Sequence, residues 1–202
     1  MDSLKVTFQQ CLSLEKESRK QSGSQLWFDL RKNRLTSSIC HKVFIRKRNF
    51  ENLCRELINP KGSDKLPANV KEALNHGKKY ESKARDAYVD VLRMKLSHSV
   101  FVTKTGIVIQ PSLYWLAASP DGLVIDETDK KTLLLEIKCP YTKRNMSPED
   151  LALDSNFYVN LKDGKPVLKK AHSLGYYSQI QLAMGISGVN IRRNILIVLL
   201  IN

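Results

Sequence analysis

The segment TLLLEIK, residues 132–138, places two charged side chains in a strand that is otherwise apolar. Side chains alternate along a β-strand, so Glu136 and Lys138 share one face with Leu134, and the residues between them share the other face. Burying a carboxylate and an ammonium costs several kcal/mol unless they pair or bind a metal. The strand therefore predicts a functional site. Its structural alternative is an ordinary Glu–Lys pair on a half-exposed edge strand.

A further acid, Asp121, precedes a glycine and opens the strand over 123–125, and the polar run 126–131 is the expected turn between the two strands. A hairpin of this length can bring Asp121 close to Glu136. Two carboxylates and a lysine at a strand end suit Mg²⁺, which prefers oxygen ligands and is often held by one or two carboxylates. Such a metal activates water and polarises a phosphodiester. Lys138 would orient the water or stabilise developing charge.

The charge balance indicates a polyanionic partner. Thirty-three Lys and Arg residues face 20 Asp and Glu residues, which gives a net charge of +13. Nucleic acid is favoured because each neutralised phosphate releases condensed counterions. The alternatives are a protein that is merely soluble and basic, or one that contacts acidic lipid. The length of 202 residues and the hydrophobic fraction of 42% suit one folded domain.

The cysteines and the two ends of the chain indicate the cellular compartment in which the protein is expected. Four widely spaced cysteines have no zinc-ligand or disulfide pattern, which predicts free thiols in a reducing compartment. The N-terminus lacks the apolar run of a signal peptide. The apolar tract over 195–201 is too short to span a bilayer as a helix. We therefore expect an intracellular protein, in the nucleus or cytoplasm, without membrane association.

Hydrophobic periodicity and turn residues predict the order of elements. The expected elements are an arm or short helix over 1–25, a helix with an N-cap at Thr36, Ser37 or Ser38, a helix over 50–58 that ends at a turn over 59–62, a long helix over 68–96, strands over 100–102, 107–109, 113–118, 123–125 and 132–138, a hairpin around 163–164, a helix over 172–185 and a strand over 195–201. This order predicts an α/β or α+β fold with a central mixed β-sheet flanked by helices.

The long helix carries an acid on its inward face. Glu81 shares a helical face with Gly77, Ala84 and Tyr88, so it points past small residues toward the interior. An inward acid is costly and favours a functional interpretation. Partial exposure near a helix end is the structural alternative.

Four blocks of the sequence occur in the order known from one nuclease family. They are the segment from Trp27 to Ser38, the segment from His76 to Ala84, the pair Ser119–Leu123 and Leu135–Tyr141, and the segment from Tyr176 to Gln181. Together they resemble the YqaJ-type viral recombinase nucleases, relatives of phage lambda exonuclease within the PD-(D/E)xK superfamily. The resemblance implies a restriction-endonuclease-like core over 26–202, preceded by the arm.

The resemblance also implies roles for the acids and the lysine. Asp121 and Glu136 would bind Mg²⁺ together with the carbonyl of Ile137, and Mn²⁺ would be a possible substitute. Glu81 would be a further acid at the same metal. Lys138 would be the catalytic lysine.

The late helix would add Gln179 near the metal, with Tyr176 one turn before it. Gln181 shares a helical face with apolar residues, so it is either a supporting residue of the site or a packed, bridging amide.

Near the N-terminus, Arg31 and Ser38 match positions that bind the 5′-terminal phosphate in the lambda-type enzymes, and Arg34 would assist them. A guanidinium forks onto phosphate oxygens, and a serine at a helix N-terminus adds a hydroxyl and oriented N–H groups. An ordinary surface arginine and a structural N-cap are the alternatives.

The activity implied by the resemblance is Mg²⁺-dependent exonuclease action on linear duplex DNA ends, 5′ to 3′, in viral-type or mobile-element recombination and repair. A homotrimer and a single-strand annealing recombinase partner are implied in the same way. The alternatives are a catalytically inactive, domesticated DNA-binding module and an endonuclease of the same fold. Residues 189–202 depart from the family pattern, so the last strand is expected to be divergent or truncated.

Overall fold

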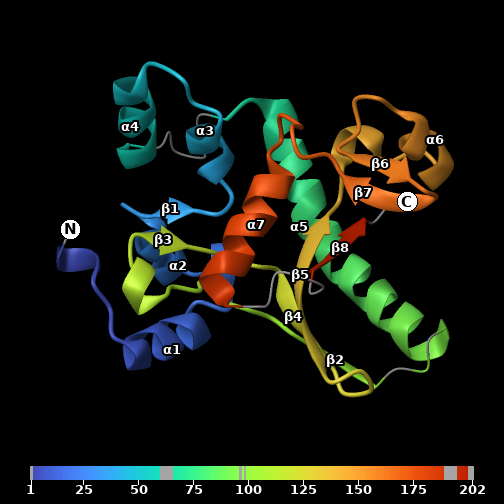
Figure 1. Cartoon of the computed structure of the whole chain (residues 1–202), viewed down its shortest axis with the longest axis horizontal. Helices are drawn as coiled ribbons and strands as arrows, with labels where there is room; N and C mark the ends of the chain where they lie inside the picture. The colour runs from blue at the N-terminus through green and yellow to red at the C-terminus, as the bar shows by residue number, and fades with distance from the viewer. Residues whose placement is uncertain (1, 60–65, 96, 98, 189–194, 200–202) are drawn as a thin grey trace.

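The computed structural model describes residues 2–59, 66–95, 97, 99–188 and 195–199 (Figure 1). The helices are α1 (Phe8–Glu17), α2 (Gln25–Arg31), α3 (Cys40–Phe44), α4 (Phe50–Ile58), α5 (Ala68–Asp90), α6 (Pro148–Leu153) and α7 (Tyr176–Ser187). The strands are β1 (Leu35–Thr36), β2 (Val100–Thr103), β3 (Leu116–Ala117), β4 (Gly122–Asp126), β5 (Lys131–Lys138), β6 (Val159–Lys162), β7 (Lys165–Leu168) and β8 (Ile195–Leu199).

A four-stranded sheet lies at the centre, in the order β2-β4-β5-β8. Strand β4 is antiparallel to both β2 and β5, and β8 runs parallel to β5, so the sheet is mixed. This confirms the predicted fold class. Because β5 lies between β4 and β8, the alternative that placed Glu136 and Lys138 on an edge strand is wrong.

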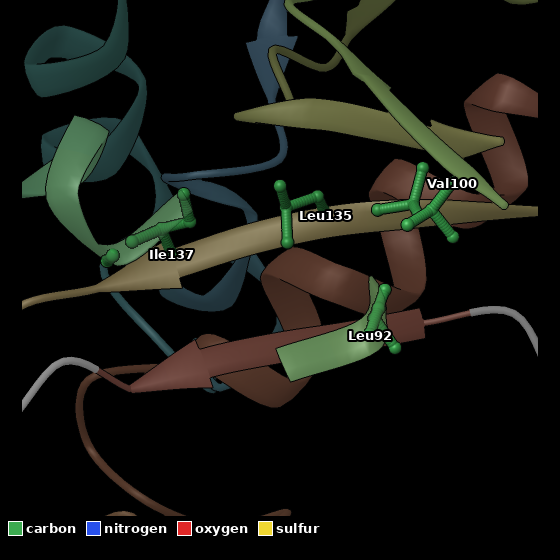
Figure 2. Packing of buried hydrophobic residues seen from close by; sticks show 6 residues of the cluster. Leu92, Val100, Leu135 and Ile137 are labelled. Atoms are coloured by element: carbon green, nitrogen blue, oxygen red, sulfur yellow. The ribbon is translucent and has the colours of Figure 1, made fainter. Parts of the chain in front are cut away.

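Helices cover both faces of this sheet, and β5 contributes to the core on each side. On one face Leu135 and Ile137 pack with Ala84 of α5 and with Leu92 (Figure 2). On the other face Leu134 packs with four buried residues of α7: Ile180, Ala183, Met184 and Ile186. The alternation predicted for this strand is therefore confirmed, and it directs Glu136 toward α7.

Two predicted strands are wrong or too long. Residues 107–109 form only an isolated bridge, Val108 to Ala118, and not a strand. The end of α1 takes hydrogen bonds at the start of this segment: the N–H of Ile107 donates to Oγ of the C-cap residue Ser18 at 2.8 Å, and the N–H of the preceding Gly106 donates to Glu15 Oε1 at 3.0 Å. The segment predicted over 113–118 contains only β3, because Pro111 begins a 3-10 turn that extends to Leu113.

The predicted cap of the third helix is also wrong. Helix α3 begins at Cys40 behind Ile39, and no side chain caps it. Thr36 lies in β1 instead, and its hydroxyl lies 3.1 Å from that of Ser38.

Helix α7 begins four residues later than predicted. Gly175 precedes it with a φ of +68°, and a Cβ at this position would lie 2.3 Å from the Cβ of His41. Glycine thus permits both the left-handed backbone and the close approach of α7 to α3. The helix ends at Ser187, and Gly188 is its C-cap residue.

Other predicted elements agree with the structure. The long helix extends through α5 into a π-helical segment, Val91–Lys95, and the hairpin turn at 163–164 joins β6 to β7. The tail forms β8 beside β5, whereas residues 200–201 and most of the predicted turn over 59–62 lie outside the described residues.

The N-terminal segment packs on the rest of the chain. Cys11 of α1 is buried with Ile107, Ile109 and Ala117. The boundary at residue 26 stays a prediction. Within the described ranges, no helix combines the length and apolar composition that a bilayer crossing needs.

Candidate active site

The hairpin of β4 and β5 brings Asp121 to the end of β5. Gly122 pairs with Leu135, and the N–H of Asp121 donates to the Leu135 carbonyl at 3.0 Å. The Asp121 carboxylate in turn accepts a hydrogen bond of 2.6 Å from the N–H of Ile137. The two predicted acids therefore lie beside each other, as the length of the hairpin suggested.

Glu136 is the most deeply buried acid of the site, with 3% of its surface exposed. Its Oε1 accepts hydrogen bonds from Lys138 Nζ and from Gln179 Nε2, each at 2.5 Å. The ammonium of Lys138 also lies 4.7 Å from the centre of the Tyr176 ring. The first turn of α7 thus provides two of the contacts that hold the charged end of β5.

The charges of this cluster shift the pKa values of Asp121 and Lys138. Burial, together with the neighbouring Glu136 carboxylate, raises the pKa of Asp121 to about 7, although Lys138 and the Ile137 N–H act in the opposite direction. Burial lowers the pKa of Lys138, but the charges of Glu136 and Asp121 outweigh it, so this pKa lies above its ordinary value. Lys138 is therefore held as an ammonium, and one carboxylate lacks a compensating charge.

Glu81 reaches the site from α5. Its carboxylate pairs with Arg85 at 2.6 Å, and its negative charge contributes to the raised pKa of Asp121. The guanidinium of Arg85 also donates to the backbone carbonyl of Asp121 at 3.3 Å. The predicted inward face of the helix thus includes an arginine that links both acids.

An open cleft of about 310 Å³ runs along these residues. It is lined by Ala73, Leu74, Gly77, Lys78, Glu81, Ile137, Lys138, Cys139, Pro140, Tyr158 and Tyr176. A neighbouring cleft of about 380 Å³ shares six of them and continues to Tyr141 and Lys143. Lys138, the catalytic lysine predicted from the sequence, therefore lines an open surface cleft.

The donor set fits a hard divalent cation. Asp121 Oδ1 and Glu136 Oε2 accept no hydrogen bond from the described residues, so each carboxylate keeps one oxygen for a ligand. A strand residue directs its N–H and C=O to the same side, so the Ile137 carbonyl faces the side of Asp121. Within the described ranges, no cluster of three or more His, Cys, Asp or Glu side chains is suited to a metal. Two carboxylates and a carbonyl nevertheless match Mg²⁺, which keeps several waters.

Arg31 and Ser38, the predicted phosphate ligands, also lie together. Arg31 donates to Ser38 Oγ at 2.9 Å and more weakly to Thr36 Oγ1 at 3.4 Å. Its guanidinium stacks on the Trp27 ring at 4.2 Å. Trp27 Nε1 donates to Ser119 Oγ at 2.9 Å, two residues before Asp121, so this basic site is joined to the metal-site loop.

Arg34 and Gln181 lie apart from these clusters. The guanidinium of Arg34 donates to the carbonyls of Leu4, Leu30 and Tyr114, and the residue is 7% exposed. These bonds indicate that it holds the N-terminal segment in place. Gln181 is exposed on α7, and its side chain forms no hydrogen bond with the described residues.

Two residues of the site were missed at the level of sequence. Arg85 lies four residues after Glu81, so the same helical-face argument could have found it. His41 donates or accepts a 2.9 Å hydrogen bond with Ser178 Oγ, one residue before Gln179. Nothing in the spacing of 137 residues predicts this contact, because it depends on how α3 packs against α7.

Comparisons with known proteins bear on the family and the fold of the chain. A family model described as "YqaJ-like viral recombinase domain" matches residues 26–190. The structure is similar to that of an alkaline exonuclease, LHK-Exo, from Laribacter hongkongensis, with 26% identity and a TM-score of 0.53 over 82% of this chain and 70% of that one. The same values hold for LHK-Exo in complex with dAMP. No curated protein sequence matches the chain.

Proposed function

The chain belongs to the YqaJ-like viral recombinase domain family, and on this premise we propose that it is a Mg²⁺-dependent exonuclease that degrades linear duplex DNA from its 5′ ends. The observation that carries the proposal is the closeness of the Asp121 and Glu136 carboxylates at the end of β5, with Lys138 on the same strand. The likeness to an alkaline exonuclease supports a nuclease, and the net charge of +13 supports a nucleic-acid substrate.

In this proposal the acids hold the metal and the surrounding residues hold the acids. Asp121, Glu136 and the Ile137 carbonyl would bind Mg²⁺, with Glu81 as a further acid. When bound, Mg²⁺ supplies Lewis acidity for the phosphodiester and lowers the pKa of an attacking water. Gln179 fixes the rotamer of Glu136 through its hydrogen bond to Oε1.

In this proposal Lys138 stabilises negative charge on the substrate. Its ammonium is protonated, lies on the cleft and is held by Glu136 and the Tyr176 ring. A phosphate in the cleft would therefore meet a fixed positive charge, which stabilises the negative charge that develops on the phosphoryl oxygens.

The 5′ polarity is assigned to Arg31 and Ser38. A terminal phosphate adds charge and acceptor oxygens that an internal phosphodiester lacks, and a guanidinium beside hydroxyl donors suits it. The Trp27–Ser119 hydrogen bond joins this site to the loop of Asp121, so a strand end bound at Arg31 has a defined position relative to the metal ligands.

The test is digestion of a linear duplex with a 5′-phosphate, with and without Mg²⁺. We expect duplex loss that requires the metal and disappears in Lys138→Ala, whose binding to the same duplex in EDTA stays within about threefold of the wild type. A wild type that binds the duplex but leaves it intact in Mg²⁺ or Mn²⁺ would support the domesticated DNA-binding module instead.

A closed circular duplex separates the exonuclease from an endonuclease of the same fold. An enzyme that starts at ends leaves the circle intact until it is cut once by a restriction enzyme. Equal rates on the circle and on the linear form would contradict the exonuclease assignment and leave the metal site unaffected.

A further inference from the structure

The outer face of α5 carries aromatic rings beside the catalytic cleft. His76 and Tyr80 lie one turn apart with ring centres 4.5 Å from each other, and Tyr141 lies 5.5 Å from His76. All three rings are only partly buried. We call these three residues the aromatic strip. It is built from α5 and from the segment that follows β5, so two parts of the chain form one surface.

Cations are interleaved with the strip. The ammonium groups of Lys79 and Lys83 lie 5.2 and 5.4 Å from the centre of the Tyr80 ring, and the Arg144 guanidinium lies 4.2 Å from that of Tyr141. Both lysines are exposed, and no described carboxylate pairs with either. Burial, and then the charges of Arg144 and Lys79, lower the pKa of His76. The Tyr141 hydroxyl donates to the Glu72 carboxylate at 2.9 Å, so one acid lies beside the three cations.

The strip is continuous with the groove of the active site. Gly77, Lys78 and Glu81, on the adjacent face of α5, line the catalytic cleft, and Tyr141 lines its neighbouring cleft. Tyr141 follows Lys138 by only three residues, across Pro140. An unpaired strand that runs along the groove past Tyr141 would therefore meet these rings.

We propose that the aromatic strip with Lys79, Lys83 and Arg144 binds single-stranded DNA, by stacking bases on the rings and pairing phosphates with the cations. The inference rests on the proposed function for the source of the single strand, since degradation of one strand from an end leaves the other unpaired. Rings and cations along one groove are the combination that binds single strands without sequence preference. A duplex hides its base faces, so rings of this kind favour the unpaired form.

The cationic side chains of the two lysines are long enough to leave the ring face, so that bases can take their place. In the free protein Lys79, Lys83 and Arg144 lie over the rings. A phosphate chain draws the two exposed lysine side chains away from the Tyr80 ring, because contact with a phosphate is stronger than an exposed cation–π contact. The vacated face then accepts a base. Arg144 is half-buried and also donates to the Tyr141 carbonyl at 2.6 Å, so it keeps its charge beside the Tyr141 ring.

The test compares binding of an unphosphorylated oligothymidine of about 15 nucleotides with binding of a blunt duplex of the same length, by fluorescence anisotropy in EDTA. We expect Tyr80→Leu and Tyr141→Leu each to weaken oligothymidine binding roughly tenfold, the size of one lost stack, with duplex binding within about twofold of the wild type. Tyr80→Phe and Tyr141→Phe keep the rings and should bind as the wild type does.

The contribution of the cations is tested separately, through the salt dependence of oligothymidine binding. Lys79→Gln and Lys83→Gln should each reduce the slope of log affinity against log salt for the oligothymidine by about 0.7. Lys16→Gln removes the same charge from α1, which lies far from the N-terminal half of α5 (Figure 1), and should leave the slope unchanged.

Two results would overturn the inference: oligothymidine binding by both leucine variants at the wild-type level, or equal weakening for oligothymidine and duplex, which would make the face a general basic surface. Circular dichroism of each variant shows whether it is folded. A failure of the proposed function can be told apart from a failure of this inference. An inactive wild type whose oligothymidine binding depends on Tyr80 and Tyr141 would retain the strip and lose the exonuclease, and Lys138→Ala should retain oligothymidine binding.

Discussion

The carboxylate of Asp121 accepts a hydrogen bond of 2.6 Å from the backbone N–H of Ile137, which ties the start of β4 to the end of β5. This bond fixes one carboxylate oxygen and leaves the other without a hydrogen bond from the described residues. The arrangement holds two acids together in a partly buried place, where burial and the second charge raise the pKa of Asp121 to about 7. The site is therefore built at some expense of stability, as expected where a cation is to be bound.

Asp121→Asn should stabilise the metal-free protein at pH 8 while abolishing hydrolysis. The folded-state pKa of about 7 lies above the ordinary value of 3.8, so the folded form retains a proton that the unfolded chain releases. Stability is consequently lost as pH rises from about 4 to about 7 and stays low above it. We expect a Tm gain of about 3 °C or more at pH 8, the shift that about 1 kcal/mol produces, and little gain at pH 4. Thermal unfolding in EDTA measures both.

Mg²⁺ provides the control for this substitution. Because a ligand that binds only the folded state raises its stability, Mg²⁺ at pH 8 should raise the Tm of the wild type and not that of Asp121→Asn. A variant that is less stable than the wild type at pH 8 in EDTA would contradict the argument.

The strand that bears Glu136 was predictable because its period of two is a local property. The faces of β5 follow from seven consecutive residues, and the nearness of Asp121 follows from the length of one hairpin. The apolar segment 107–109 is no strand, because the N–H of Ile107 bonds to Ser18, the C-cap of α1, and that of the preceding Gly106 bonds to Glu15, each about 90 residues away. Partners at that separation are not encoded in local periodicity.

The start of α7 shows the same limit. Helical periodicity extends back to residue 172, but the helix begins at Tyr176, where Gly175 lies against His41. The position of Gln179 relative to Glu136 depends on this contact between α3 and α7. Residue types and the family resemblance indicated that Gln179 belongs to the site, whereas its bond to Oε1 required the packing of the two helices on the sheet.

Gln179→Ala should lower kcat and leave KM for DNA nearly unchanged. The Gln179 amide donates to Oε1 of Glu136, so its loss disorders a residue that is proposed to bind the metal. The amide is not placed to bind the DNA backbone, so KM should change little. Loss of such a supporting group typically costs about 10- to 100-fold. Steady-state digestion at saturating Mg²⁺ measures both constants. Gln181→Ala, two residues along the same helix and exposed, is the matched control and should behave as the wild type.

Loss of Glu81 and loss of Arg85, which form an ion pair, should lower the free energy of unfolding by unequal amounts. The Arg85 side chain is 10% exposed and its Nε has no partner among the described residues, whereas the Glu81 side chain is 39% exposed. Glu81→Ala leaves a buried guanidinium and should cost about 2 kcal/mol. Arg85→Met leaves a carboxylate that can turn to water, so it should cost less, about 1 kcal/mol or below.

Urea unfolding in EDTA at pH 7 gives both free energies. Equal losses in the two variants would mean that Glu81 is as confined as Arg85. A double variant should be no less stable than Glu81→Ala, since it removes the unpaired charge.

Arg31→Gln should abolish the preference for a 5′-phosphorylated end. Its guanidinium lies on the Trp27 ring and donates to Ser38, so it is held in one orientation, and burial lowers its pKa, although it remains charged at neutral pH. Hydrogen bonds to a charged group contribute about 1.5–3 kcal/mol, so the wild type should degrade a phosphorylated end at least about tenfold faster than a 5′-hydroxyl end. In the variant the two rates should become equal, mainly through slower digestion of the phosphorylated duplex.

Lys32→Gln is the control for this substitution. It removes an exposed charge from the next residue and should slow digestion from both kinds of end alike, which keeps the ratio of the two rates. A wild type without end preference, or a Lys32→Gln variant that loses it as fully as Arg31→Gln, would mean that general charge near α2 and not the oriented guanidinium selects the end.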